Sequence, residues 1–209
     1  MHIVDGVLSA PVLIGGNVLA VGGLALGLRL MHAEQIPRAA LLTAAFFVAS
    51  LVHIPLGPSS AHLAMTGLMG VLMGWSVFPA VFVGLVLQAV FFGYGGVTVL
   101  GVNTLILASP AVLAGIVFRA GLGPVRNGHS GLRGFLAGAG AIAGSTLLLG
   151  LALALSGREF VPAAKLALLG HIPLMLVEGL VTASAVMLLQ RVMPELWLKQ
   201  VPGPAGETA

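Results

Sequence analysis

The first two residues of the chain, Met1 and His2, carry nitrogen atoms that could chelate one metal ion. Removal of an initiator methionine generally requires a small second side chain, so we expect Met1 to remain, with a free amine. That amine, the backbone nitrogen of His2 and its Nδ1 atom would close adjacent chelate rings around a cation. Cu(II) and Ni(II) favour such nearly planar nitrogen donors. A fourth donor, such as a distant neutral imidazole, would complete the plane, although a Met-His start can also arise by chance.

Four further ionisable side chains stand in otherwise apolar sequence: His53 and His62 in VHIPLGPSSAHL, and His171 and Glu178 in GHIPLMLVEG. Ionisable groups at membrane depth are costly and by default indicate a functional site. A single buried histidine is nevertheless more often a hydrogen-bonded packing residue than a ligand. His171 and Glu178 share a helix face by their spacing. Their candidate roles are a structural hydrogen bond to another helix, which we favour, a waiting position for incoming metal, or a contact with an energising subunit.

The composition is that of an integral membrane protein. Of 209 residues, 58% are hydrophobic and 7% are charged, whereas about a quarter of the residues in a soluble domain are charged. No Asp, Glu, Lys or Arg occurs between Arg38 and Arg119, an interval far longer than the roughly 20 residues of one crossing. The net charge of +3 is better explained by topology anchors than by nucleic-acid binding. The chain has no cysteine, which excludes disulfides and thiolate metal sites.

Hydrophobic runs broken by charges, proline and glycine predict an all-α, polytopic bundle of about seven transmembrane helices. The predicted spans are 8–28, 39–54, 61–76, 79–95, 100–118, 134–155 and 166–190. We expect residues 1–193 to form a single transmembrane metal-binding domain and residues 194–209 a disordered cytoplasmic tail. Small residues in pairs such as Gly70 with Gly74 and Gly140 with Gly144 are typical of close helix packing, or of a face that docks a partner.

The basic residues predict the orientation. No Lys or Arg precedes Arg29, which favours an N-terminus outside and, with seven spans, a cytoplasmic C-terminus. Only Arg158 and Lys165 then lie outside, as the positive-inside rule requires. Seven basic residues lie on the cytoplasmic side: Arg29, Arg38, Arg119, Arg126, Arg133, Arg191 and Lys199. A re-entrant segment within 55–100 would change the side of the C-terminus.

Four segments, in this order along the chain, resemble the CbiM/NikM family: MHIVDGVLS, HIPLGPSSAHLAMTGLMGVLMG, GYGGVTVLGVNTL and GHIPLMLVEG. Members of this family are the substrate-binding membrane components of energy-coupling-factor (ECF) transporters for cobalt and nickel. The family usually begins MHIPDG, so Val4 departs from the pattern at one position. The second segment resembles the nickel branch more than the cobalt branch.

The resemblance implies a set of metal ligands. They are the amine of Met1, the backbone nitrogen and imidazole of His2, and the imidazole that matches His62. His62 is favoured over His53 because it carries the histidine of the family's SSxH pattern, at the start of a helix. His53 would then support a ligand or replace one.

Two further residues are expected to support the site. Asp5, next to Gly6, could accept backbone hydrogen bonds in a turn that folds the N-terminus back into the bundle. It could also orient His2, although we favour the turn. Asn103 follows a glycine-rich loop whose backbone can approach the N-terminus, so it is expected to hydrogen-bond to the inserted segment.

The resemblance further implies that the chain captures Ni²⁺ or Co²⁺ at the extracytoplasmic side of a prokaryotic inner (plasma) membrane and passes it inward. The implied partners are a membrane coupling (T) component, two cytoplasmic ATPase subunits and a small membrane companion. The sequence contains no Walker A or glycine-rich phosphate loop, so the chain is not expected to be an enzyme by itself. We expect no resident cofactor and no nucleic acid, because the metal is the cargo. The choice between nickel and cobalt stays open.

Two other functions remain as alternatives. A stand-alone passive divalent-metal permease would need no ATPase. An intramembrane metalloenzyme using His53, His62 and Glu178 is less favoured, because the sequence lacks the HExxH spacing that sets two histidines and a base around zinc.

Overall fold

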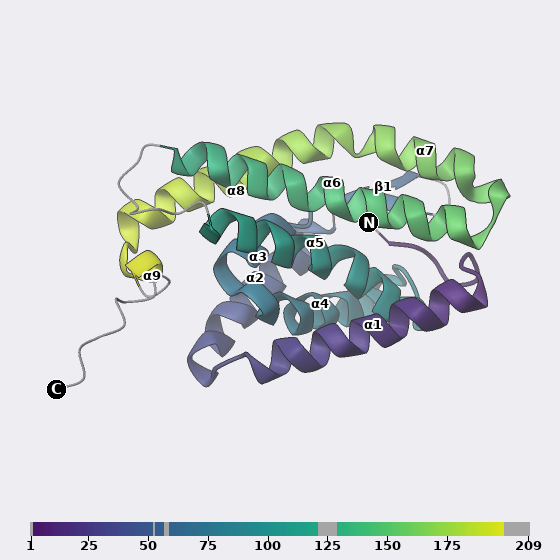
Figure 1. The fold of residues 1–209 in the computed structure, drawn as a ribbon, viewed down its shortest axis with the longest axis horizontal. Helices are drawn as coiled ribbons and strands as arrows, with labels where there is room; N and C mark the ends of the chain where they lie inside the picture. The colour runs from purple at the N-terminus through teal and green to yellow at the C-terminus, as the bar shows by residue number, and fades with distance from the viewer. Residues whose placement is uncertain (1, 52, 57–58, 121–128, 199–209) are drawn as a thin grey trace.

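The computed structural model describes residues 2–51, 53–56, 59–120 and 129–198, and Figure 1 shows them as an almost entirely helical bundle. The predicted all-α class is therefore confirmed. The helices are α1 (Ala10–Arg29), α2 (Ile36–Ala49), α3 (Thr66–Met73), α4 (Val77–Phe92), α5 (Leu100–Ala120), α6 (Ser130–Ser156), α7 (Val161–Gly170), α8 (Ile172–Val192) and α9 (Glu195–Leu198). Short 3₁₀ turns at Ala33–Gln35, Gly74–Ser76 and Arg158–Phe160 precede α2, α4 and α7.

Five segments of the described chain are long and apolar enough to cross a membrane: Ala10–Arg29, Thr66–Phe92, Leu100–Ala120, Ser130–Ser156 and Ile172–Val192. The second contains both α3 and α4, because the chain bends at Gly74, whose φ is +59°. This bend separates the two short spans that the sequence predicted here. Helix α2 has 14 residues, fewer than a straight crossing needs.

The predicted span 39–54 is wrong at its end, and the span 61–76 at its start. Helix α2 stops at Ala49, and a two-stranded antiparallel hairpin follows, β1 (His53–Leu56) and β2 (Ser59–His62). His53 lies opposite His62 in its register. Pro55 lacks the N–H group that an α-helix would need at this position. The predicted span 166–190 is likewise divided at His171, between α7 and α8.

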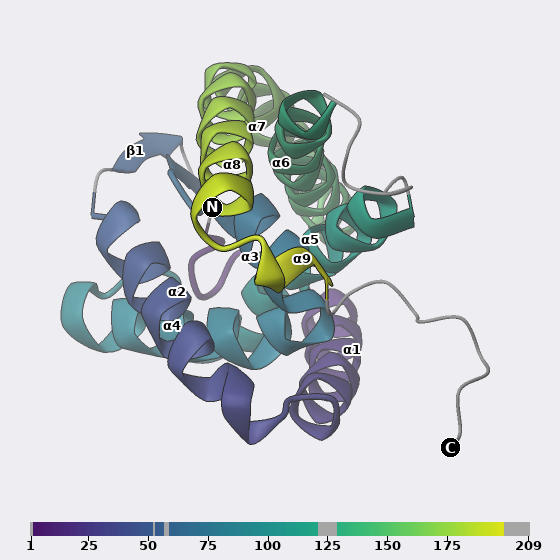
Figure 2. The same ribbon diagram turned by 90° about the vertical axis from the view of Figure 1, so that its left-hand side faces the viewer.

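Helix α3 is the centre of the bundle. All eight of its residues are buried, and Figure 2 shows it enclosed by the surrounding helices. Glycines make this packing possible: a Cβ atom on Gly67 would lie 2.5 Å from the Cα atom of Gly138 on α6, and one on Gly70 would overlap the backbone of Ala111 on α5. The predicted close helix packing through small residues is thus present around α3.

The outer surface carries large apolar side chains, including Ile14, Val18 and Leu19 on α1, each more than 60% exposed. This surface suits contact with lipid. The C-terminal ends of α1 and α8 and the N-terminal end of α6 lie on the left of Figure 1. They carry Arg29, Arg191 and Arg133, all predicted to be cytoplasmic.

The packed domain continues beyond residue 193, where the sequence suggested that a tail begins. Helix α9 spans Glu195–Leu198, and Trp197 is 2% exposed. Its ring lies 5.8 Å from that of Phe118 on α5, measured between centroids. Residues 199–209 of the predicted tail lie outside the described residues.

Candidate metal centre

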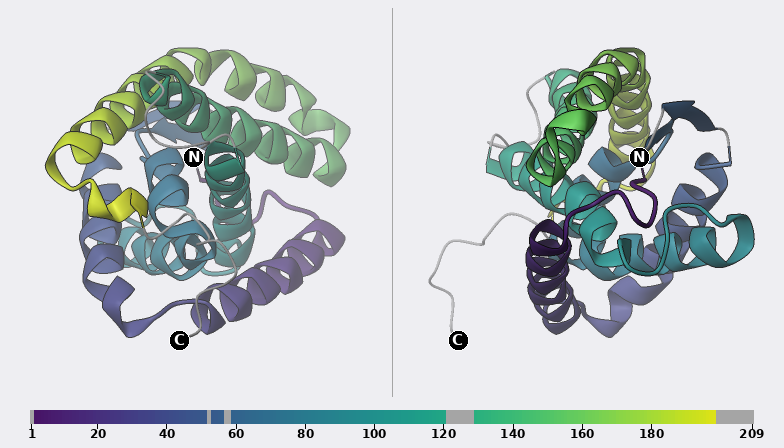
Figure 3. Two further views of the ribbon diagram at one scale, coloured as in Figure 1. Left: turned by 60° about the vertical axis from the view of Figure 1, so that its left-hand side comes forward. Right: turned by 90° about the vertical axis from the view of Figure 1, so that its right-hand side faces the viewer.

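The N-terminal segment leaves α1 and runs back into the bundle, as the right-hand view of Figure 3 shows. His2 and Ile3 are both buried there. The imidazole of His2 stacks on that of His62, with 4.6 Å between ring centroids and 23° between planes. Two histidines that are far apart in the sequence therefore meet at one point, directly before α3 begins.

His62 is oriented by the backbone of the residue that follows it. Its Nδ1 atom lies 3.1 Å from the carbonyl oxygen of Leu63. A neutral imidazole that donates from Nδ1 to this oxygen has its lone pair on Nε2, the nitrogen that can bind a metal. Rings also surround the pair: Tyr94 lies 6.1 Å from His2, and Phe46 lies 6.3 Å from His62, between centroids.

Asn103 on α5 holds the inserted segment by two hydrogen bonds. The backbone N–H of Ile3 donates to Asn103 Oδ1 at 2.9 Å, and Asn103 Nδ2 donates to the carbonyl oxygen of Ile3 at 3.0 Å. The Asn103 side chain is 2% exposed. Both the N–H and the C=O group of Ile3, the residue after His2, are therefore held by Asn103. The sequence suggested hydrogen bonds of this kind for Asn103.

Asp5 links the same segment to the loop before α5. Its Oδ1 atom accepts hydrogen bonds from Thr98 Oγ1 and, at 3.3 Å, from the backbone N–H of Val99. Its own N–H donates to the carbonyl oxygen of Gly95 at 3.3 Å. The carboxylate thus anchors the turn to a neighbouring loop.

Two glycines let this loop lie so close to the N-terminus. Gly95 and Gly96 have φ values of +78° and +152°, which side chains strongly disfavour. A Cβ atom on Gly96 would also collide with the carboxylate of Asp5. The sequence GYGG is therefore what allows the loop to approach.

The other two buried ionisable residues, Glu178 and His171, hydrogen-bond to different segments. Glu178 on α8 is fully buried, and its Oε1 atom accepts the backbone N–H groups of Ala64, at 2.5 Å, and Met65, at 2.6 Å. His171, also fully buried, has its Nδ1 atom 2.6 Å from the carbonyl oxygen of Ala167. The bond from Glu178 to the segment that follows His62 was not foreseen, because nothing in the sequence connects GHIPLMLVEG to that turn.

Two predicted site residues cannot be placed. Met1 lies outside the described residues, as does the side chain of His53, whose backbone pairs with His62. Within the described part, no three His, Cys, Asp or Glu residues gather around a point where a metal could sit. Beyond His2 and His62, further donors to such a site would come from the backbone or from groups outside the described side chains.

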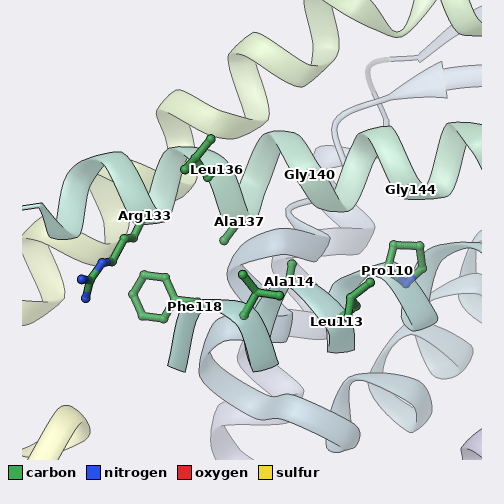
Figure 4. Close-up of a pocket in the computed structure, with 10 residues that line it drawn as sticks. Pro110, Leu113, Ala114, Phe118, Arg133, Leu136, Ala137, Gly140 and Gly144 are labelled. Atoms are coloured by element: carbon green, nitrogen blue, oxygen red, sulfur yellow. The ribbon is translucent and has the colours of Figure 1, made fainter. Parts of the chain in front are cut away.

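An apolar groove of about 390 Å³ between α5 and α6 is a separate feature (Figure 4). Small residues such as Ala114, Ala137 and Gly140 line it, with Arg133 at one end. Its lining contains no metal-ligating side chain and none of the residues that contact His2 or His62 in the described structure. The groove is therefore distinct from the candidate metal centre.

Comparison with known proteins gives a match over almost the whole chain. Residues 2–196 match the family CbiM, described as a cobalt uptake substrate-specific transmembrane region. A protein of Haemophilus influenzae, named provisionally as a metal transport protein, is 40% identical over 204 residues, which cover 94% of this chain and 96% of the relative.

A fused nickel transport protein, NikMN of Rhodobacter capsulatus, is 39% identical over 90 residues, or 41% of this chain and 26% of that protein. Among solved structures, a transition metal transporter superposes with a TM-score of 0.73 at 24% identity, covering 95% of this chain and 96% of the other. At this identity the superposition supports the fold alone.

Proposed function

Because the chain belongs to the CbiM family of cobalt uptake substrate-specific transmembrane regions, we propose that it is the metal-binding component of an ECF-type importer for Ni²⁺ or Co²⁺. It is a multi-pass membrane protein and a component of cobalt/nickel transport, not an enzyme. The observation that carries the proposal is the stacking of His2 on His62, with 4.6 Å between their ring centroids. Both residues are buried.

The proposed site uses four nitrogens: the amine of Met1, the backbone nitrogen of His2, His2 Nδ1 and His62 Nε2. The first three follow from the connectivity of two adjacent residues. The fourth is supported by the contact of His62 Nδ1 with Leu63, which favours Nε2 as the donor. The bonds from Asn103 and Asp5 hold the chelating segment in place before metal arrives.

Such a set favours Ni(II), which accepts planar nitrogen donors, and Cu(II) would bind at least as tightly by intrinsic preference. Metal supply and the rigidity of the binding site would then determine which metal ion is transported. The amine and the amide lose protons on binding, so affinity falls as the pH falls. The metal would be captured at the extracytoplasmic side of a prokaryotic inner (plasma) membrane, where the proposed orientation places the N-terminus.

Inward release would use partners. A T component, two cytoplasmic ATPases and a small companion subunit would supply the coupling and the energy. The fused nickel transport protein NikMN supports a membrane partner, because a segment similar to this chain is named there as part of a fusion.

The direct test is nickel binding by purified protein whose intact mass shows Met1 retained and unblocked. We expect one nickel per chain, a visible d–d absorption band typical of planar nitrogen coordination, and weaker binding at lower pH. One extra residue before Met1, His2→Ala or His62→Ala should each weaken binding by at least the roughly 10–100-fold that loss of a ligand-supporting residue costs.

His129→Ala is the matched control, because this histidine is exposed at the start of α6, and it should bind nickel like the wild type. Undiminished binding by the extended chain would exclude the amine as a ligand. If His53→Ala abolishes binding and His62→Ala does not, the fourth ligand is His53.

A further inference from the structure

A buried carboxylate on α8 holds the turn that joins His62 to α3. Glu178 is 0% exposed, and one of its oxygens, Oε1, accepts the N–H groups of both Ala64 and Met65. These amides lie two and three residues beyond His62 in the chain. The contact joins segments more than 110 residues apart.

The turn needs such a restraint. Met65 has φ +53°, and in the described part of the chain it is the one non-glycine residue with a positive φ. A side chain in this left-handed conformation is unfavourable and persists where surrounding contacts hold it. Two N–H groups converging on one oxygen provide that hold.

We propose that Glu178 is a positioning residue of the metal site, which fixes the imidazole of His62 beside His2 by holding the backbone of Ala64 and Met65. This inference rests on the proposed function, because it assigns Glu178 a role in metal binding through His62. Glu178 itself touches no metal. A movement of α8 relative to α3 would pass through this contact to the site.

Three substitutions separate positioning from a role of the negative charge. Glu178→Gln removes any negative charge but keeps an amide oxygen at the position of Oε1. Glu178→Asp keeps the carboxyl group but draws its oxygens back by one methylene group. Glu178→Leu removes both the carboxyl group and the acceptor. Positioning therefore predicts that the Gln variant stays close to the wild type in nickel affinity, whereas the Asp and Leu variants lose roughly tenfold or more.

The measurement is nickel affinity with the d–d absorption band, for each variant alone and in a His62→Ala background. If Glu178 acts through His62, the Asp substitution weakens binding and shifts the band only while His62 is present. Thr182→Val is the matched control, because Thr182 is fully buried one turn further along α8 and its hydroxyl has no hydrogen-bond partner in the described chain. It should leave both readouts unchanged.

The Asp and Gln variants keep the test valid if the Leu variant does not fold. A loss in the Gln variant without a loss in the Asp variant would assign the effect to charge and overturn the proposal. Equal losses in the two would also overturn it, because the Gln variant keeps the acceptor oxygen. Wild-type affinity in the Asp variant, or the same loss with and without His62, would overturn it as well. If His62→Ala itself binds nickel like the wild type, the proposed metal site has failed, and that result is distinct from a failure of the Glu178 inference.

Discussion

Asn103 is the side chain that most directly fixes the N-terminus inside the bundle. It donates to and accepts from the same residue, Ile3, across a separation of 100 positions. Both groups of Ile3 are buried backbone polar groups, which are costly when unpaired. The position of the neighbouring residue His2 thus depends on a side chain of α5.

Asn103→Leu should therefore damage both stability and metal binding. It leaves the N–H and C=O groups of Ile3 without their partners, at a cost of about 1–3 kcal/mol for each buried group. We expect a lower thermal unfolding midpoint in detergent and a clear loss of nickel affinity. Asn17→Leu is the control, since Asn17 makes one exposed bond, to the carbonyl oxygen of Thr98 at 3.0 Å. Equal effects of the two substitutions would show that Asn103 has no special role.

At the scale of elements, α3 is short, wholly buried and held at both ends. Glu178 binds the turn before it. At its other end, Arg119 donates to the carbonyl oxygens of Gly70 and Val71, and Arg38 to that of Leu72. The carbonyl of Gly70 also accepts the N–H of Gly74. The last carbonyls of a helix generally lack partners within the helix, and a positive charge is favourable there. The helix next to the candidate metal centre is therefore held at both of its ends.

Gly138 on α6 packs directly against both α3 and α8, so Gly138→Ala should destabilise the bundle. An added Cβ would lie 2.4 Å from the carbonyl oxygen of Glu178 and 2.6 Å from Thr182 Oγ1. Overpacking of this kind costs about 1–3 kcal/mol, which a lower unfolding midpoint would reveal. Gly140→Ala, two residues along, has no atom within 4 Å and should leave the midpoint unchanged or raise it slightly. A midpoint unchanged in both variants would contradict the close packing described here.

At the scale of the whole molecule, the chain carries a proposed metal site but no ATPase motif in its sequence. The sequence has no phosphate-binding loop. The described helices expose many large apolar side chains, and such a surface suits contact with lipid or with membrane partners. A passive permease and a component of an ATP-driven importer share these features. The two functions differ in their need for a partner.

Expression in cells that lack any ECF coupling module distinguishes them. We expect nickel accumulation only when a T component and its ATPases are expressed with the chain, and none with an ATPase whose Walker A lysine is replaced. The His62→Ala chain, expressed with the complete partner set, controls for uptake by other routes. Accumulation by the chain alone would establish the passive permease.

The sequence by itself was sufficient for several properties that depend on neighbouring residues. Apolar runs predicted the membrane helices, because a bilayer imposes length and composition locally. The chelating potential of Met1 and His2 is also local, since covalent connectivity sets it. The hairpin at His53 to His62 was missed, because short apolar runs do not distinguish strand from helix.

Only the tertiary structure decided which distant groups meet. The stacking of His2 on His62, the bonds of Asn103 to Ile3 and those of Glu178 to Ala64 and Met65 join segments 60 to 114 positions apart. No local pattern encodes such a pairing, because it results from the packing of helices whose glycines permit close approach. The sequence indicated that this chain lies in a membrane and could chelate a metal, and the packing around α3 decided where His2 and His62 come together.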